Sequence, residues 1–306
     1  MAGDSIAKGD TRMIRVVMLG RLGNNLFQYA LGRVLSEKHG VPLVMDASWF
    51  NAEGWGEVKC LRDLPGPASG KARIVRPLTL ASRALRKATG KHRWQLRGIP
   101  GFTERDDDHA FDPRVFDVPA DALLFGYFQT PLYFSGIEAS LREELNTHGL
   151  GLEKGREELA EKLRAPGSVA VHVRRGDYAG NPRLDICGPD YYAEAIRRMR
   201  AAVPGARFHI FSDDPAWCAD RFRGADMTVV TAPPSQSPLV DLHLMSLAGH
   251  HVIANSSYSW WAAWLGKKEG QRVMMPHEWQ RGIHAPIDEK QCDGWEIVDP
   301  SGNEMK

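Results

Sequence analysis

The second half of the chain alternates short apolar runs with longer amphipathic ones, and this alternation constrains the fold most strongly. Strand-like runs lie at 168–173, 207–212, 227–230, 251–255 and 272–276. Helix-like runs lie between them at 189–203, 214–222, 237–249 and 257–266. Strands that alternate with helices form a parallel sheet covered by helices. Because ligands bind at the carboxyl ends of such strands, the polar residues that follow each strand are candidates for a functional site.

The first half carries a weaker form of the same pattern. Strand-like runs at 13–19, 41–46 and 121–128 accompany helix-like runs at 26–40 and 135–149. Residues 47–119 show no clean periodicity and are expected to be an insertion of loops and short helices. A chain of 306 residues is longer than one compact core usually holds. We therefore expect an α/β protein of two domains, 1–150 and 151–306, joined near the glycine-punctuated stretch 149–168.

Composition argues against several classes of function. The net charge is +1 and the isoelectric point is near 7.8, so no global basic field favours nucleic acid. No apolar run approaches the ~20 residues that a membrane span needs, and residues 1–12 lack the apolar core of a signal peptide. The four cysteines are scattered without a CxxC pair, which argues against a disulfide framework or a structural zinc site. We expect a cytoplasmic protein.

The sequence VAVHVRRGDY ends a buried strand in two arginines. Side chains alternate along a strand, so His172 and Arg174 are expected on one face and Arg175 on the other. A guanidinium group binds phosphate through two parallel hydrogen bonds, which suits a diphosphate leaving group. The alternative is that the arginines pair with Asp177 or Asp185. An adhesion role for the Arg-Gly-Asp tripeptide is weaker, because a buried strand would place it there by accident.

Two further strands end in polar residues. The run FHIFSDDP places Asp213 and Asp214 at a carboxyl end, where carboxylates can accept hydrogen bonds from the N1 and N2 groups of guanine. Asp214 also suits the N-cap of the helix that follows. After another strand, Asn255, Ser256 and Ser257 stand where helix-start amides and hydroxyls hold phosphate, although a plain N-cap is commoner. The tryptophans of the next helix are expected to be core residues rather than a sugar platform.

The loop GRLGNN, between the first strand and the first helix, resembles a nucleotide-binding loop. A dinucleotide fold requires G-x-G-x-x-G, and Gly20 and Gly23 supply only G-x-x-G, with Arg21 where a small residue should stand. The indication of NAD binding is therefore weak. A short glycine loop that faces a cleft still carries Asn24 and Asn25 toward a substrate.

Two other charged segments are weaker candidates for a site. ERDDDH contains the DxD motif that holds a metal ion in many sugar-nucleotide enzymes, but it follows an irregular stretch, so we interpret it as a solvated loop. The stretch 71–97 holds nine Lys or Arg residues and no acid. Such a run is most often a solvated face. The alternative is a peripheral contact with the inner face of a membrane or with a lipid-linked acceptor.

Four motifs together resemble the bacterial α-1,2-fucosyltransferases, glycosyltransferase family 11. The motifs are GRLGNNLFQYALG, VHVRRGDY, FSDDPAWC and NSSYSWWAAWLG, in that order and at family-like spacing. They extend from Gly20 to Gly266, and their combination is highly specific although no single motif is. Asn25 departs from the pattern, since the family usually has glutamine at this position.

The resemblance implies a GT-B fold, in which two Rossmann-like domains face each other across a cleft. It also implies an inverting transfer of L-fucose from GDP-β-L-fucose to the 2-hydroxyl of a terminal galactose, without a metal ion or other cofactor. The acceptor would be an O-antigen repeat, lactose or a related β-galactoside. The donor would lie on the second domain and the acceptor on the first.

The resemblance also assigns roles to individual residues. Those that would hold the donor diphosphate are Arg174, Arg175, Asn255, Ser256 and Ser257, while His172 with Asp213 or Asp214 would meet guanosine. The acceptor-side residues would be Gly23, Asn24 and Asn25. An inverting enzyme also needs a base on the acceptor side, and the candidates are Asp177 and Asp185.

Three other functions are compatible with parts of the sequence. A transferase that uses another GDP-sugar or forms another linkage, such as α-1,6, would suit the HxR motif and the acidic strand end equally well. An NAD-dependent dehydrogenase is faintly allowed by the glycine loop and Asp46. An adhesion or sugar-binding module would use the Arg-Gly-Asp tripeptide and the tryptophans.

Overall fold

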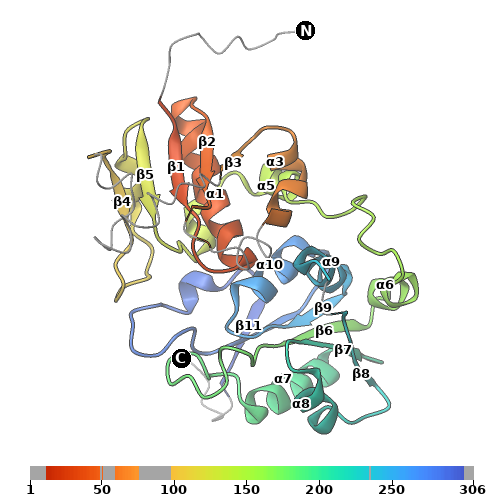
Figure 1. The fold of residues 1–306 in the computed structure, drawn as a ribbon. Coiled ribbons are helices and arrows are strands. Elements are labelled where there is room, and N and C mark those ends of the chain that lie inside the picture. The colour runs from red at the N-terminus through yellow and green to blue at the C-terminus, as the bar shows by residue number, and fades with distance from the viewer. Residues whose placement is uncertain (1–11, 49, 51–58, 76–97, 234–235, 300–306) are drawn as a thin grey trace.

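A computed structural model describes residues 12–48, 50, 59–75, 98–233 and 236–299 of the chain. The first half forms a parallel sheet with the strand order β3-β2-β1-β5-β4 (Figure 1). Its strands are β1 (Ile14–Val17), β2 (Leu43–Asp46), β3 (Arg73–Val75), β4 (Gly101–Thr103) and β5 (Ala122–Phe125). The chain order of the strands changes direction between β1 and β5, so the loops that follow these two strands flank a topological switch point.

The second half forms another parallel sheet, with the strand order β11-β10-β9-β6-β7-β8. Its strands are β6 (Ser168–Val173), β7 (Arg207–Ser212), β8 (Met227–Val229), β9 (His250–Val252), β10 (Val273–Pro276) and β11 (Trp295–Val298). The switch point of this sheet lies between β6 and β9. In open parallel sheets the crevice outside the carboxyl ends of two such strands is where ligands bind.

Helices connect the strands in both halves. They are α1 (Leu22–His39), α3 (Pro65–Ala68), α5 (Glu138–Glu144), α6 (Glu157–Arg164), α7 (Pro189–Ala202), α8 (Pro215–Arg221), α9 (Pro238–Leu247) and α10 (Ser257–Leu265). Short 3-10 helices are η1 (Lys59–Asp63), η3 (Pro113–Asp117), η4 (Pro131–Phe134) and η5 (Asp288–Lys290). Helices α7, α8 and α9 each begin with proline, whose missing N–H is not needed in a first turn. The C-cap of helix α1 is Gly40, which adopts the left-handed conformation with φ of 63°.

The two Rossmann-like halves face each other, so the predicted GT-B-type fold is confirmed. Figure 1 shows the first sheet above the second, with α10 and α9 between them. Helix α10 packs against α1 of the first half as well as α9 of the second. The tryptophans of α10 are core residues as expected, because Trp260 and Trp261 are 1% and 0% exposed. The ring of Phe27 in α1 lies 4.8 and 5.0 Å from theirs, so one aromatic cluster joins the two halves.

The stretch 47–119 is not only an insertion of loops and short helices. It contributes the strands β3 and β4 to the two edges of the first sheet. Each of these strands is three residues long and partly exposed, and such a strand has too few residues to show the alternation by which strands are recognised in a sequence. Strand β11 was missed for a similar reason, since it has four residues at the edge of the second sheet.

The C-terminal part of the chain returns to the first half before it forms β11. The hydroxyl of Thr130 donates a hydrogen bond of 2.5 Å to the backbone oxygen of Glu289. The Nζ atom of Lys290 donates to the backbone oxygen of Gln129 at 3.0 Å. Because Lys290 is only 1% exposed, this segment is an integral part of the contact between the halves.

The described residues contain no helix that is both long and apolar enough to cross a membrane. Of the basic stretch 71–97, the residues 76–97 lie outside the described part of the chain. Lys71 and Arg73 are exposed. A contact of this stretch with a membrane or a lipid-linked acceptor stays a prediction.

Candidate active site

Strand β6 delivers Arg174 to the switch point of the second sheet. All six residues of β6 are buried, and Arg174 is the first residue beyond its carboxyl end. The Nη1 atom of Arg174 lies 2.6 Å from Asp213 Oδ2, and the Nη2 atom donates to Asp177 Oδ1 at 2.5 Å. The side chain is 14% exposed, so two carboxylates hold a guanidinium group that still reaches the surface. Such a group is oriented before a ligand arrives.

Asp177 pairs with Arg174 and not with Arg175, whose partners lie in the loop after β7 and in α8. The Nε atom of Arg175 donates to Asp214 Oδ2 at 3.1 Å, and its guanidinium carbon lies 4.1 Å from the ring centre of Trp217. Trp217 packs with the cluster that holds Val171 and Val173, on the face of β6 away from His172 and Tyr258, which agrees with the expected placement of Arg175. Both arginines form ion pairs with the aspartates that follow β7.

The two aspartates after β7 have separate tasks. Asp214 is the N-cap of α8, and its side chain accepts a hydrogen bond of 3.1 Å from Trp217 N, as the capping alternative predicted. Asp213 accepts from the backbone N–H of Arg175 at 2.8 Å in addition to its contact with Arg174. Its side chain is 27% exposed. Asp213 therefore orients the arginines, and its role toward guanine stays a prediction.

His172 is the last but one residue of β6 and is 6% exposed. Its ring centre lies 5.7 Å from that of Tyr258 in α10. Burial, aided by the positive charge of Arg174, lowers the pKa of His172 to about 4. The imidazole is therefore neutral at physiological pH, so it adds no positive charge beside Arg174.

Helix α10 begins beside Arg174, at the other strand of the switch point. Its N-cap Ser256 forms no side-chain capping hydrogen bond, and its first turn contains no acid. Such a helix start offers backbone N–H groups and a positive dipole end to an anion. Asn255 was expected to hold a ligand, but its side chain is buried. Its amide group instead donates to the backbone oxygens of Leu184 and Trp279 at 3.1 and 3.0 Å.

The glycine loop of the first half touches the start of α10. Asn24 Oδ1 accepts hydrogen bonds from Ser257 Oγ at 2.5 Å and from Gln129 Nε2 at 2.7 Å. Asn24 thus joins the loops after β1 and β5 to α10, and it brings predicted acceptor-side and donor-side residues together. A Cβ atom on Gly23 would lie 2.4 Å from Tyr258 N, so only glycine allows this approach.

Asn25 does not line the sugar side. Its side chain is 0% exposed, and its amide donates to Leu19 O and Gln28 Oε1, both at 2.9 Å. The reason is its place in α1, whose first turn carries Asn24 toward the second half and Asn25 into the first half. Asn25 therefore fixes the shape of the loop after β1.

The two candidate bases occupy different positions in the loop after β6. Asp177 has a half-exposed side chain beside the guanidinium group of Arg174. Asp185 accepts a hydrogen bond of 2.8 Å from Gly180 N, which closes its own loop. Asp177 is the one of the two that shares a charge contact with Arg174.

Sequence reasoning missed three residues that the fold brings to this place. The charge of Arg21, the exposed N-cap of α1, reaches Tyr178 in the loop after β6. Burial raises the pKa of Tyr178 to about 12, and the charges of Arg174 and Arg21 oppose this rise. Gln129 connects Asn24 to Trp279, whose Nε1 atom donates to Gln129 Oε1 at 2.8 Å. Arg21 had a signal in the sequence, since it is the one charged residue in the glycine loop.

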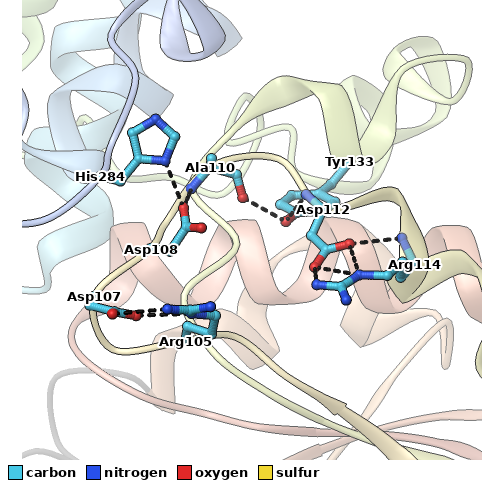
Figure 2. Close-up of polar contacts among 8 residues, drawn as sticks. All are labelled: Arg105, Asp107, Asp108, Ala110, Asp112, Arg114, Tyr133 and His284. Carbon is cyan, nitrogen blue, oxygen red and sulfur yellow. Dashed lines mark hydrogen bonds and ion pairs between the residues drawn. The ribbon is translucent and has the colours of Figure 1, made fainter.

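The DxD segment follows β4, at the carboxyl edge of the first sheet, where the loops after β1 and β5 also lie. Figure 2 shows that Asp107 pairs with Arg105 and that Asp108 accepts a contact from His284, at 3.0 Å in each case. Asp107 and Asp108 are thus engaged by Arg105 and His284 in a loop, as the interpretation of a solvated loop expected. Within the described residues no group of three or more His, Cys, Asp or Glu could hold a metal ion.

Glu104 lies between this segment and β4, and it is 8% exposed. Its carboxylate accepts hydrogen bonds from Tyr127 N at 2.6 Å and from Phe128 N at 3.1 Å. Phe128 has a positive φ of 55°, which few side chains tolerate, so Glu104 helps to hold a strained turn. Burial raises the pKa of Glu104 to about 7, and burial lowers the pKa of the neighbouring Lys290 to about 8.

We expect Glu104 to make the stability of the protein depend on pH. An acid whose pKa is higher in the folded chain than its ordinary value of 4.5 stabilises the folded state below pH 4.5. This contribution is lost as the pH rises from 4.5 through 7. The free energy of unfolding of the native protein, relative to Glu104→Gln, should fall by ~3 kcal/mol over this window. Denaturant unfolding at several pH values measures it, and parallel pH profiles for the two proteins would contradict it.

Comparisons with known proteins show which proteins this chain resembles. The profile of the family described as "Glycosyl transferase family 11" matches residues 88–296. An "Alpha-1,2-colitosyltransferase" of Escherichia coli is 29% identical over 275 residues, which are 86% of this chain and 90% of that protein. A "Galactoside 2-alpha-L-fucosyltransferase SEC1" of Bos taurus is 32% identical over 80% of this chain and 62% of that protein. A crystal structure of "NodZ alpha-1,6-fucosyltransferase soaked with GDP-fucose" has a TM-score of 0.49 and 14% identity, covering 84% of this chain and 93% of that one.

Proposed function

Since the chain belongs to glycosyltransferase family 11, we propose that this glycosyltransferase is an inverting α-1,2-fucosyltransferase. It moves L-fucose from GDP-β-L-fucose to the 2-hydroxyl of a terminal galactose in a glycan acceptor. Support comes from the relatives, one of which is named a galactoside 2-α-L-fucosyltransferase.

The observation that carries the proposal is the position of Arg174. It stands at the switch point of the second sheet, held by Asp177 and Asp213, beside the uncapped start of α10. Departure of GDP leaves new negative charge on the β-phosphate. A preorganised guanidinium group and helix amides stabilise such charge most in the transition state. The neutral His172 leaves this electrostatic work to Arg174.

The first half supplies the acceptor side of the reaction. Asn24, which bonds to Ser257 at the start of α10, places the loops after β1 and β5 next to the donor side. A galactose 2-hydroxyl bound there attacks the anomeric carbon from the face opposite GDP, which inverts the configuration. A carboxylate takes the hydroxyl proton, and Asp177 and Asp185 remain the candidates for this base.

A second candidate differs only in the sugar that is transferred. The relative named a colitosyltransferase covers most of this chain, and colitose is the 3-deoxy counterpart of L-fucose. Rates of GDP release with GDP-fucose and with a GDP-colitose donor, measured against one β-galactoside, separate the two functions. A clear preference for GDP-colitose over GDP-fucose would replace fucose by colitose in the proposal.

Binding of GDP tests the donor site without a choice of acceptor. We expect GDP, but not NAD, to raise the melting temperature of the protein. Asp213→Asn should weaken GDP binding by ~1.5–3 kcal/mol, because a charged hydrogen-bond acceptor that holds Arg174 is lost. Calorimetry measures this, with Asp220→Asn as a matched control at an exposed ion pair in α8. Equal affinities in Asp213→Asn and the native protein would refute the role of Asp213.

A further inference from the structure

A cavity of about 550 Å³ lies beside β4 in the first half. None of the residues that line it has been assigned above to the binding of the donor or the acceptor. The size of the cavity is typical of a small-molecule site. The partly exposed rings of Phe102 and Phe111 line the cavity, and the buried ring of Tyr133 packs behind Phe111, with 5.0 Å between the two ring centres. The rings of Phe102 and Phe111 form an aromatic wall that offers flat apolar surface to the cavity.

Charged side chains form the rest of the wall, and most of them are already compensated. Figure 2 shows the ion pairs of Arg114 with Asp112 and of Arg105 with Asp107, and the contact of Asp108 with His284. An anionic ligand therefore finds no unbalanced cation among the described residues of this wall. The same carboxylates and guanidinium groups provide many acceptors and donors for the hydroxyl groups of a neutral ligand.

The cavity is physically joined to the acceptor side of the proposed reaction. Its wall residue Glu104 accepts hydrogen bonds from the backbone of residues 127 and 128. The next residue, Gln129, donates to Asn24, which accepts from Ser257 at the start of α10. Residues 127–129 thus link the wall of the cavity to the acceptor side by hydrogen bonds.

We propose that the cavity is a second acceptor subsite, which binds a neutral sugar unit of the glycan beyond the galactose that receives the transferred sugar. The apolar face of the pyranose ring lies on the aromatic wall, and its hydroxyls bond to Glu104, Asp108 and Arg114. The inference rests on the proposed function for the identity of the ligand. It predicts that the enzyme distinguishes acceptors by the sugar next to the galactose.

Direct binding tests the subsite without the transfer reaction. The probes are a neutral trisaccharide with a non-reducing terminal β-galactose and methyl β-galactoside. Ligand-observed NMR with the native protein should show saturation transfer to the protons of the unit next to galactose. Ala110→Trp fills the cavity from its wall, and Arg114→Ala removes an exposed donor without touching the core. Both should weaken binding of the trisaccharide at least tenfold, and Arg197→Ala, an exposed paired arginine on α7, is the control.

Kinetics separates failure of the subsite from failure of the proposed function. The ratio of kcat/KM for the trisaccharide to kcat/KM for methyl β-galactoside should fall about tenfold in both cavity variants and stay constant in the control. Transfer to galactosides with an unchanged ratio and unchanged NMR signals would overturn the subsite alone. Absence of any transfer by the native protein would refute the proposed function, and the NMR result would still decide whether the cavity binds a glycan.

Discussion

Arg174→Lys is expected to lose about 10²–10³-fold in kcat, the loss that follows removal of a donor aimed at developing charge. Lysine keeps the positive charge but not the planar fork that reaches Asp177, Asp213 and a phosphate at once. The loss should appear mainly in kcat, because the charge on the departing GDP is greatest in the transition state. Arg175→Lys should lose less, since Arg175 turns toward Asp214 and Trp217 of α8 rather than toward the start of α10.

Steady-state kinetics of GDP release, with and without EDTA, measures both effects. We propose that Arg174 does the work of a metal ion, so the native enzyme should keep its full rate in the chelator. Arg197→Lys changes an exposed arginine that pairs with Glu194 on α7, and it serves as the control. Normal turnover of Arg174→Lys, or activity that EDTA abolishes and Mn²⁺ restores, would sink the proposal.

Gly23→Ala is expected to destabilise the protein by ~1–3 kcal/mol and to lower activity by about 10²-fold. The new Cβ atom would lie 2.4 Å from Tyr258 N and 2.6 Å from Ser257 C, which are backbone atoms that no rotamer change can move. Helices α1 and α10 must then separate, at the cost typical of overpacking. The hydrogen bond from Ser257 to Asn24 is strained at the same time, and misplacement of reactants by about 1 Å costs about 10²-fold in rate.

Thermal unfolding and the rate of GDP release test this prediction together. Gly188→Ala is the matched control, because Gly188 has an ordinary φ of −76° and no atom lies within 4 Å of its added Cβ. A Gly23→Ala protein that is as stable and as active as Gly188→Ala would show that the two helices do not need this close approach.

The sequence by itself determined the strands of the second half other than β11, and the polar residues at their ends. The predicted runs 168–173 and 207–212 coincide with β6 and β7. These strands are buried on both faces, so their continuous apolar runs cannot be mistaken for exposed segments. Because all strands are parallel, the residues that follow β6 and β7 had to meet at one edge of the sheet, and Arg174 does meet Asp213 there.

Only the tertiary structure decided which polar side chains face the other half of the molecule and which form hydrogen bonds within their own half. Asn24 and Asn25 are neighbours of the same type, yet Asn24 reaches Ser257 and Asn25 bonds within its own domain. The contact of Lys290 with Gln129 joins segments that are 161 residues apart in the chain, and those of Glu104 with Tyr127 and Phe128 join segments 23 and 24 residues apart. Local patterns carry the period of a helix or strand and the chemistry of a turn. The direction of a single side chain, and the partner that it finds, depend on how two domains pack, and no local pattern records that.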